Sequence, residues 1–180
     1  MLTEELQTLR EIATCLETAG MDYMLTGSMA LNCYAQPRMT RDIDLVVAFY
    51  LRDADRIEGV LGTDWYVSPE AAKEAVLQQT SFNAIHQRTL IKVDFMIRKR
   101  EEFRHHEFSR RVRLKVADFE VWTVSKEDLI LSKLDWASSS LSERQLSDVE
   151  NLIASGCDLD YLQEWSAKLN LTDMLTRVSR

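Results

Sequence analysis

Hydrophobic residues recur along this chain at two spacings, which predict helices alternating with strands. An apolar residue at every third or fourth position predicts helices at residues 2–16, 52–61 and 69–77. Four short apolar runs have the length of strands, and they lie at residues 23–25, 42–49, 82–86 and 91–97. Strands interleaved with helices predict an α/β (α+β) fold with a mixed sheet.

Past residue 111 the pattern changes from a hairpin to a series of helices. Residues 112–116 and 119–124 have the spacing of two strands joined by a tight turn. Neither an internal repeat nor a low-complexity linker separates this hairpin from the helices after it. We therefore divide the chain into a core of residues 1–124 and a small helical C-terminal part of residues 125–180.

Capping residues predict where the helices of the second part begin. Ser125 and, three residues later, Asp128 have the pattern of a capping box. Ser142 and Gln145 repeat this pattern after a polar loop at residues 138–140. Two further amphipathic segments lie at residues 158–169 and 171–178.

The strongest chemical signal begins where the first strand breaks. Gly27-Ser28 supplies flexible dihedral angles at the break, and a helix is predicted from Met29 to Tyr34, before Pro37. Backbone N–H groups at such a turn, together with the N-terminus of the helix, form an anion site suited to a phosphate.

Two carboxylates follow on the next strand. Asp42 and Asp44 share one face of that strand, because side chains alternate along it. Two like charges this close repel each other, and a divalent cation such as Mg²⁺ relieves the repulsion. Alone, so short a pattern favours the simpler interpretation of a strand edge that faces water. The neighbouring phosphate site favours the metal instead.

These residues resemble the signature of the DNA polymerase β-like nucleotidyltransferase superfamily, which is Gly-Ser or Gly-Gly, a spacer, and Asp-x-Asp on a strand. The matching residues are Gly27, Ser28, Asp42 and Asp44. The run RMTRDIDL, residues 38–45, is more narrowly similar to the AbiEii/AbiGii-type toxin nucleotidyltransferases. The resemblance extends over residues 21–155, and it implies the nucleotidyltransferase fold.

A third acid lies on the strand at residues 91–97. Val93 and Phe95 face one way, whereas Asp94 faces the other with Lys92. A buried carboxylate without a partner costs several kcal/mol, so Asp94 is expected to pair with a base or a metal, or to lie at a sheet edge in water. The resemblance implies that Asp94 is the third catalytic carboxylate, which binds the metal and accepts the proton of the attacking hydroxyl.

The resemblance also implies nucleotide-binding residues outside the two aspartate strands. Arg38 and Thr40 belong to the matching run, and Lys133, Arg144 and Asp148 match a recurrent closing segment of small nucleotidyltransferases. The residues alone allow a simpler interpretation. Lys133 then lies along an apolar surface with its ammonium in water. Arg144 and Asp148, four positions apart on an exposed helical face, then form a surface ion pair that contributes little to stability.

Positive charge is concentrated in residues 98–115. This segment holds eight Lys or Arg and three Glu, a net charge of +5, which leaves −12 for the rest of a chain whose total is −7. One interpretation is a solvated helix and an outward strand face; the other is a surface that binds the phosphates of an RNA acceptor. The adjacent His105 and His106 point to different faces of a helix and are not expected to bind a metal together.

Composition agrees with a compact enzyme. The chain has 180 residues, 46% of them hydrophobic, which is enough for one sizeable core. No signal peptide or membrane-length apolar run is present, so we expect a cytoplasmic protein without a membrane partner. Cys15, Cys33 and Cys157 are scattered and odd in number, which favours reduced thiols.

Together these features predict metal-dependent transfer of a nucleoside monophosphate from an NTP to an acceptor, with Mg²⁺ or Mn²⁺ held by Asp42, Asp44 and Asp94. The acceptor is RNA, as in toxin relatives that are paired with a cognate antitoxin, or else a protein side chain or a small molecule such as an antibiotic. A non-catalytic nucleotide-binding or partner-binding protein is a further alternative. The presence of three carboxylates argues against it, because a binding module needs no such set.

Overall fold

The computed structural model describes residues 2–140 and 142–179. Within these residues the chain forms one mixed seven-stranded sheet and nine helices, which confirms the predicted α/β fold. The strands are β1 (Tyr23–Thr26), β2 (Ile43–Val47), β3 (Trp65–Val67), β4 (Ser81–His86), β5 (Lys92–Ile97), β6 (Val112–Val116) and β7 (Phe119–Thr123). The helices are α1 (Glu4–Thr18), α2 (Gly27–Leu31), α3 (Leu51–Leu61), α4 (Pro69–Gln78), α5 (Glu102–Ser109), α6 (Lys126–Ser140), α7 (Glu143–Ala154), α8 (Leu159–Lys168) and α9 (Thr172–Val178).

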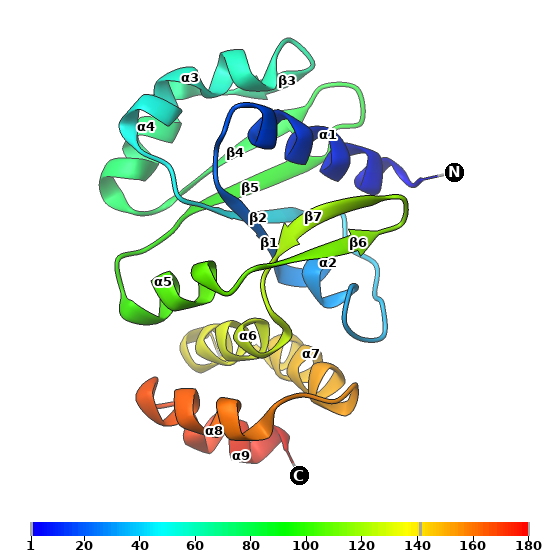
Figure 1. Cartoon of the computed structure of the whole chain (residues 1–180), viewed down its shortest axis with the longest axis vertical. Helices are drawn as coiled ribbons and strands as arrows, with labels where there is room; N and C mark the ends of the chain where they lie inside the picture. The colour runs from blue at the N-terminus through cyan, green and yellow to red at the C-terminus, as the bar shows by residue number, and fades with distance from the viewer. Residues whose placement is uncertain (1, 141, 180) are drawn as a thin grey trace.

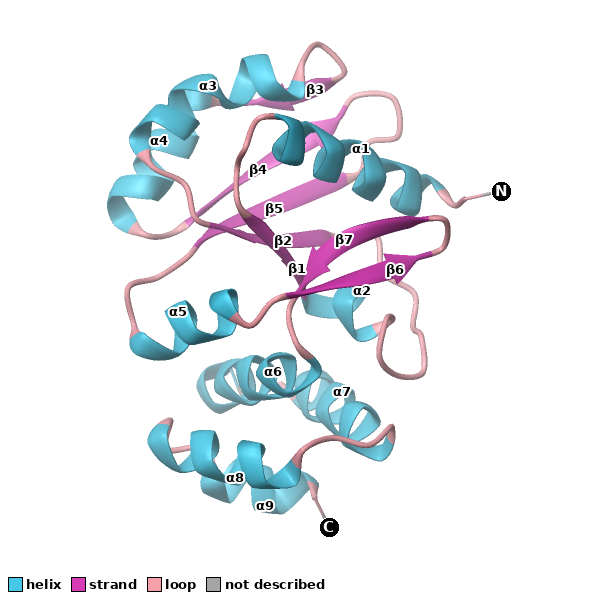
Figure 2. Ribbon diagram, viewed as in Figure 1, coloured by secondary structure: helices cyan, strands magenta, loops and turns pink. Residues whose placement is uncertain are grey.

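The strand order is β3-β4-β5-β2-β1-β7-β6. At its centre β2 runs antiparallel to β1 and parallel to β5, so the two strands that carry the predicted catalytic aspartates are neighbours. In Figure 1, α1, α3 and α4 lie on the upper side of the sheet, and α5 to α9 lie below it. Figure 2 shows the same division, with the strands between the two groups of helices.

The two faces of the central strands differ in burial. Ile43, Leu45 and Phe95 are fully buried, whereas Asp44 and Asp94, on the opposite face, are half-buried. This alternation follows from the two-residue period of a strand, and it confirms the expected orientation of β2 and β5. The incompletely covered face is the one that carries the acids.

The segment between β1 and β2 differs from the prediction at both of its ends. Helix α2 begins at Gly27, not Met29, and ends at Leu31, not Tyr34. It ends early because the Asn32 side chain turns back to the loop, donating to the Arg38 carbonyl and accepting from the Arg38 N–H, both at 2.9 Å. Strand β2 begins at Ile43, so Asp42 lies just before the strand.

The C-terminal helices correct two further predictions. The expected polar loop at residues 138–140 is the last turn of α6, because the three serine hydroxyls donate to carbonyls three or four residues earlier. The capping box at Ser142 is absent, since no side chain caps α7 and Gln145 instead accepts from Lys133. The Ser125 cap of α6 is confirmed, because the Asp128 N–H donates to Ser125 Oγ at 3.3 Å. The Ser125 hydroxyl in turn donates to Asp128 Oδ2 at 2.7 Å.

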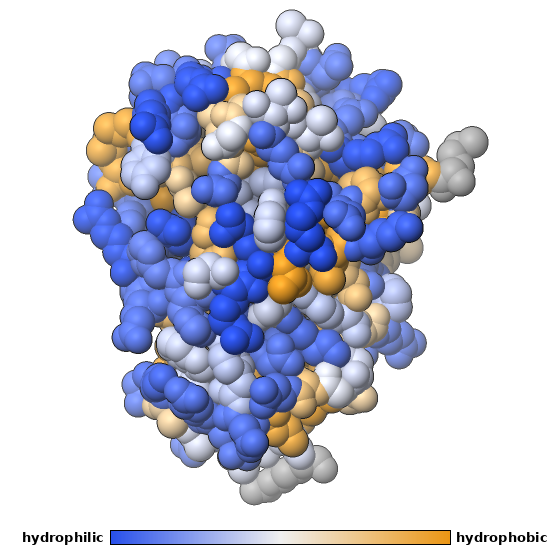
Figure 3. All heavy atoms as spheres, in the orientation of Figure 1, coloured by the Kyte–Doolittle hydropathy of each residue, from blue (hydrophilic) through white to orange (hydrophobic). Residues whose placement is uncertain are grey.

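The proposed boundary between residues 124 and 125 falls in the short connection between β7 and α6. In the view of Figure 3, hydrophilic residues cover most of the surface of both parts, and hydrophobic residues occur in small groups. None of the helices in the described ranges has the length and apolarity that a membrane crossing requires.

Candidate active site

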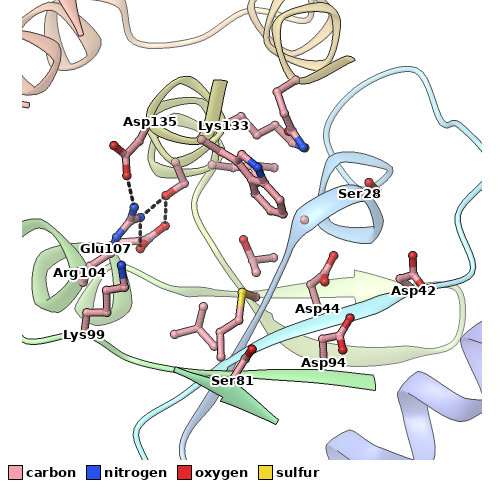
Figure 4. Close-up of a pocket in the computed structure, with 18 of the residues that line it drawn as sticks. Ser28, Asp42, Asp44, Ser81, Asp94, Lys99, Arg104, Glu107, Lys133 and Asp135 are labelled. Atoms are coloured by element: carbon pink, nitrogen blue, oxygen red, sulfur yellow. Dashed lines mark hydrogen bonds and ion pairs between the residues drawn. The ribbon is translucent and has the colours of Figure 1, made fainter. Parts of the chain in front are cut away.

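A cavity of about 750 Å³ lies between the half-buried face of the sheet and helix α6. Nine of the ten residues predicted for the site line it: Gly27, Ser28, Arg38, Thr40, Asp42, Asp44, Asp94, Lys133 and Arg144. In Figure 4 the aspartates rise from the strands on one side, and Lys133 comes from the helix on the other. The tenth residue, Asp148, lies behind this wall and is buried.

Gly27 brings the end of β1 against the aspartate strand. Its φ of +66° is in the left-handed region, and a Cβ at this position would lie 2.0 Å from Asp44 Oδ2. A side chain is therefore excluded both by the backbone conformation and by the carboxylate. This contact explains why a glycine stands before Ser28, and it fixes the turn beside the acids.

Asp44 and Asp94 occupy adjacent positions on parallel strands, and Figure 4 shows their side chains on the same side of the sheet. Burial, followed by the negative charges of Asp94 and Asp42, raises the pKa of Asp44 from 3.8 to about 6. The cations Lys133 and Lys92 offset this effect only in part. The site thus holds negative charge that the protein itself does not neutralise.

The donor set suits a hard cation, since all three candidate ligands are carboxylates and Mg²⁺ prefers oxygen ligands. In the described parts of the chain, however, no three His, Cys, Asp or Glu side chains are arranged as a ready metal-binding group. Asp94 is instead bound by Lys92, with Nζ 2.7 Å from Oδ2. Lys92 occupies one oxygen of this carboxylate, and the assignment of a metal to the three aspartates stays a prediction.

On the opposite wall a buried carboxylate joins two cations. Asp148 accepts from Arg38 Nε at 2.8 Å and Nη2 at 2.9 Å, and from Lys133 Nζ at 2.8 Å. Arg38 Nη2 also contacts Ser28 Oγ. The network connects the turn after β1 with α6 and α7, so the phosphate-binding candidates from both parts of the chain are held together.

Burial would raise the pKa of Asp148, but hydrogen bonds from Arg38 and Lys133 outweigh it and lower that pKa. Burial also lowers the pKa of Lys133, and Asp148 compensates only in part. Both side chains are 5% exposed. The structure therefore does not support the simpler interpretation of these residues, in which the Lys133 ammonium reaches into water and Asp148 forms a surface pair with Arg144.

Arg144 and Thr40 lie at the margin of the cavity. Arg144 is exposed and lines the cavity, and no ion pair joins it to another described residue. The Thr40 hydroxyl donates to the Asp42 carbonyl at 3.4 Å, which supports the chain just before β2. Arg38 Nη1 is buried and has no hydrogen-bond acceptor in the described ranges. Arg144 thus keeps exposed donors that a bound anion can use.

Four of the eight basic residues in the segment 98–115 form ion pairs with acids, all of which except Glu107 lie outside the segment. Its ion pairs are Arg104 with Glu107 and Asp135, Arg110 with Asp128, Arg111 with Asp22, and Arg113 with Glu17 and Glu120. Arg98, Lys99, Arg100 and Lys115 form no ion pair with the described residues. Of these four, Arg98 and Lys99 line the cavity. A phosphate-binding surface, one of the two interpretations of this segment, would therefore rest on this smaller group of cations without a described ion-pair partner.

One polar group in the cavity wall has no signal in the sequence analysis. Ser132 Oγ donates to Glu107 at 2.5 Å and accepts from Arg104 at 2.6 Å, and Arg104 also contacts Asp135 at 2.6 Å. Figure 4 shows this group beside Lys99, away from the three aspartates. Burial raises the pKa of Glu107 despite these contacts. The i,i+3 spacing of Arg104 and Glu107 is compatible with a local ion pair, but it does not reveal Ser132 or Asp135.

Comparisons with known proteins place this geometry in context. A family model described as "Nucleotidyl transferase AbiEii toxin, Type IV TA system" matches residues 13–172. No curated protein matches the chain.

Among solved structures, the antibiotic-resistance factor ANT(2'')-Ia has a TM-score of 0.58 at 14% identity, over 98% of this chain and 97% of that one. The lincomycin-bound lincosamide antibiotic adenylyltransferase LnuA has a TM-score of 0.56 at 16% identity, over 86% of this chain and 98% of that one. An antigenic nucleotidyltransferase-like protein from Paracoccidioides brasiliensis has a TM-score of 0.56 at 19% identity, over 85% of this chain and 76% of that one. At these identities the similarity establishes a shared fold.

Proposed function

The chain belongs to the AbiEii family of nucleotidyl transferases, and from this premise we propose that it transfers a nucleoside monophosphate from an NTP to an acceptor hydroxyl, with release of pyrophosphate. One observation carries the proposal. A single cavity has three carboxylates on its sheet side and a group of cations on its helical side. This is the charge distribution that a metal-bound triphosphate requires.

Each wall has its own task in this proposal. Ser28, Arg38, Lys133 and Arg144 bind the triphosphate oxygens, and Asp148 holds Arg38 and Lys133 in place through its three hydrogen bonds. Asp42, Asp44 and Asp94 are the residues that would hold Mg²⁺ or Mn²⁺. When bound, the cation neutralises charge that develops on the phosphates. In this proposal Asp94 accepts the proton of the attacking hydroxyl.

We propose RNA as the acceptor. Arg98 and Lys99 support this choice, because they line the cavity and are not paired with described acids. In a type IV toxin–antitoxin system, the role implied by the family description, a cognate antitoxin would counteract the transfer. A small-molecule hydroxyl is the second candidate, favoured by the fold that the chain shares with ANT(2'')-Ia and LnuA.

The test is a labelling reaction with each α-labelled NTP, total cell extract, and either Mg²⁺ or EDTA. We expect label in a product that ribonuclease destroys and protease does not, only when Mg²⁺ is present. A label that survives both enzymes and migrates as a small molecule would support the second candidate. No transfer from any NTP would contradict the proposed activity.

A further inference from the structure

Trp136 is unlike the other tryptophans of the chain. It lies on α6 with 58% of its surface exposed, and it lines the cavity. The other tryptophans are buried or half-buried, and they are Trp65, Trp122 and Trp165. An indole ring contributes most when its faces are covered, because it is among the largest apolar surfaces that a protein has. Trp136 is therefore available to a ring that enters the cavity.

The sheet supplies an apolar surface beside the catalytic carboxylates. Val46 and Met96 are register partners on β2 and β5, two residues beyond the pair Asp44 and Asp94 on the same face. Both are half-buried and line the cavity that Trp136 also lines. Two residues along a strand correspond to about 7 Å, so the acidic part of the sheet changes to an apolar part within one nucleotide's length. Methionine sulfur also makes favourable contacts with aromatic rings.

The helix positions Trp136 relative to the phosphate site. Lys133 and Trp136 are separated by three residues on α6, hence by nearly one helical turn on the same side, and both line the cavity. A nucleotide whose phosphates contact Lys133 would extend its base along the helix toward Trp136 on one wall and toward Met96 on the other.

We propose that Trp136, with Val46 and Met96, forms the subsite for the nucleobase of the NTP, and that the base stacks on the indole face. The inference rests on the proposed nucleotidyl transfer and adds the residue that selects the donor. A purine covers more apolar surface than a pyrimidine, so the subsite prefers ATP and GTP over CTP and UTP.

The test measures binding of the four NTPs and of inorganic tripolyphosphate by calorimetry, in Mg²⁺, to the full-length wild type, Trp136→Ala and Trp136→Phe. In Trp136→Ala we expect about tenfold weaker binding of ATP and GTP, a smaller loss for CTP and UTP, and unchanged binding of tripolyphosphate. Trp136→Phe retains an aromatic face and should keep purine affinity within about threefold. ATP should quench tryptophan fluorescence of the wild type and much less that of Trp136→Phe.

Trp122→Phe is the matched control, because Trp122 lies outside this cavity, against Arg111 and Arg113. It should leave both affinity and quenching unchanged. If a folded Trp136→Ala bound each NTP as tightly as the wild type does, the inference would be overturned, but the proposal of nucleotidyl transfer would not be affected. A loss restricted to acceptor binding would overturn it as well. If neither tripolyphosphate nor any NTP bound the wild type, the proposed function and the inference would fail together.

Discussion

Two aspartates show opposite electrostatic behaviour: Asp44 lines the cavity on the sheet side, and Asp148 lies behind the opposite wall. Asp148 is bonded to two cations, and its pKa is lowered. Asp44 is largely buried and lies near two other carboxylates, Asp94 and Asp42, and both effects raise its pKa to about 6. The protein thus satisfies the charge of Asp148 internally and leaves that of Asp44 to a ligand. A carboxylate that pairs with cations of the protein stabilises the site, whereas a carboxylate without such partners is available to bind a ligand.

The largest expected effect follows from changing Asp44 or Asp42, the acids whose charge the protein does not neutralise. Asp44→Asn and Asp42→Asn each preserve shape but remove a charge, and they should lower NTP transfer by about 100-fold or more, because stabilisation of charge on the phosphates is lost. Labelled transfer at saturating Mg²⁺ measures the effect, and circular dichroism checks the fold. Either variant with full activity would refute the assignment of the aspartates.

Asp148, whose charge is neutralised by Arg38 and Lys133, should contribute mainly to the stability of the fold. Asp148→Ala leaves Lys133 buried without its anion, and we expect a loss of about 3 kcal/mol in the free energy of unfolding. Urea denaturation measures it. Asp135→Ala is the matched control, because the half-exposed Asp135 also pairs with an arginine and should cost less than about 1 kcal/mol. If Asp148→Ala and Asp135→Ala lowered the free energy of unfolding equally, the buried pairs of Asp148 would contribute no more to stability than an exposed pair.

The raised pKa of Asp44 predicts a pH dependence of stability in metal-free buffer. Its folded-state pKa of about 6 lies above the ordinary value of 3.8, so the unfolded chain releases this proton first as pH rises. The contribution of Asp44 is favourable below pH 4 and is lost between pH 4 and 6. Relative to Asp44→Asn, the wild type should lose about 1–3 kcal/mol across this range. Parallel pH profiles for the two proteins would contradict the raised pKa.

The smallest expected effect concerns the cations that no described acid neutralises. Reversing Arg98 and Lys99 to Glu should weaken RNA binding and reduce the salt slope of the binding constant by roughly 1–2, because two phosphate contacts are lost. Arg100 and Lys115, changed to Glu together, give the same charge change outside the cavity and should have less effect. Equal effects in the two double variants would argue against a defined RNA path through the cavity.

Much of the molecule could be predicted because its signals are local. The alternation of apolar and polar residues along β5 predicted the face on which Asp94 lies, and the Gly27-Ser28 turn with the aspartate strand indicated where a site would lie. That the strand of Asp94 neighbours that of Asp44 was implied by the family resemblance and not by the alternation. Contacts between distant segments carried no such signal. The side-chain bonds of Asn32 to the Arg38 backbone ended α2 early, and the buried partners of Asp148 replaced its expected surface pair with Arg144. Periodicity gives the face of a helix, but it does not give the partner on another element.

The bond between Arg38 and Asp148 joins positions 110 residues apart. During synthesis the aspartate strands and the Gly27 turn emerge long before α7, and domains fold from the N-terminus as the chain lengthens. A ribosome-bound chain that ends before α7 therefore carries its carboxylates without the group that holds Arg38 and Lys133. The group that holds Arg38 and Lys133 is therefore completed only after α7 has been synthesised and has folded against the core.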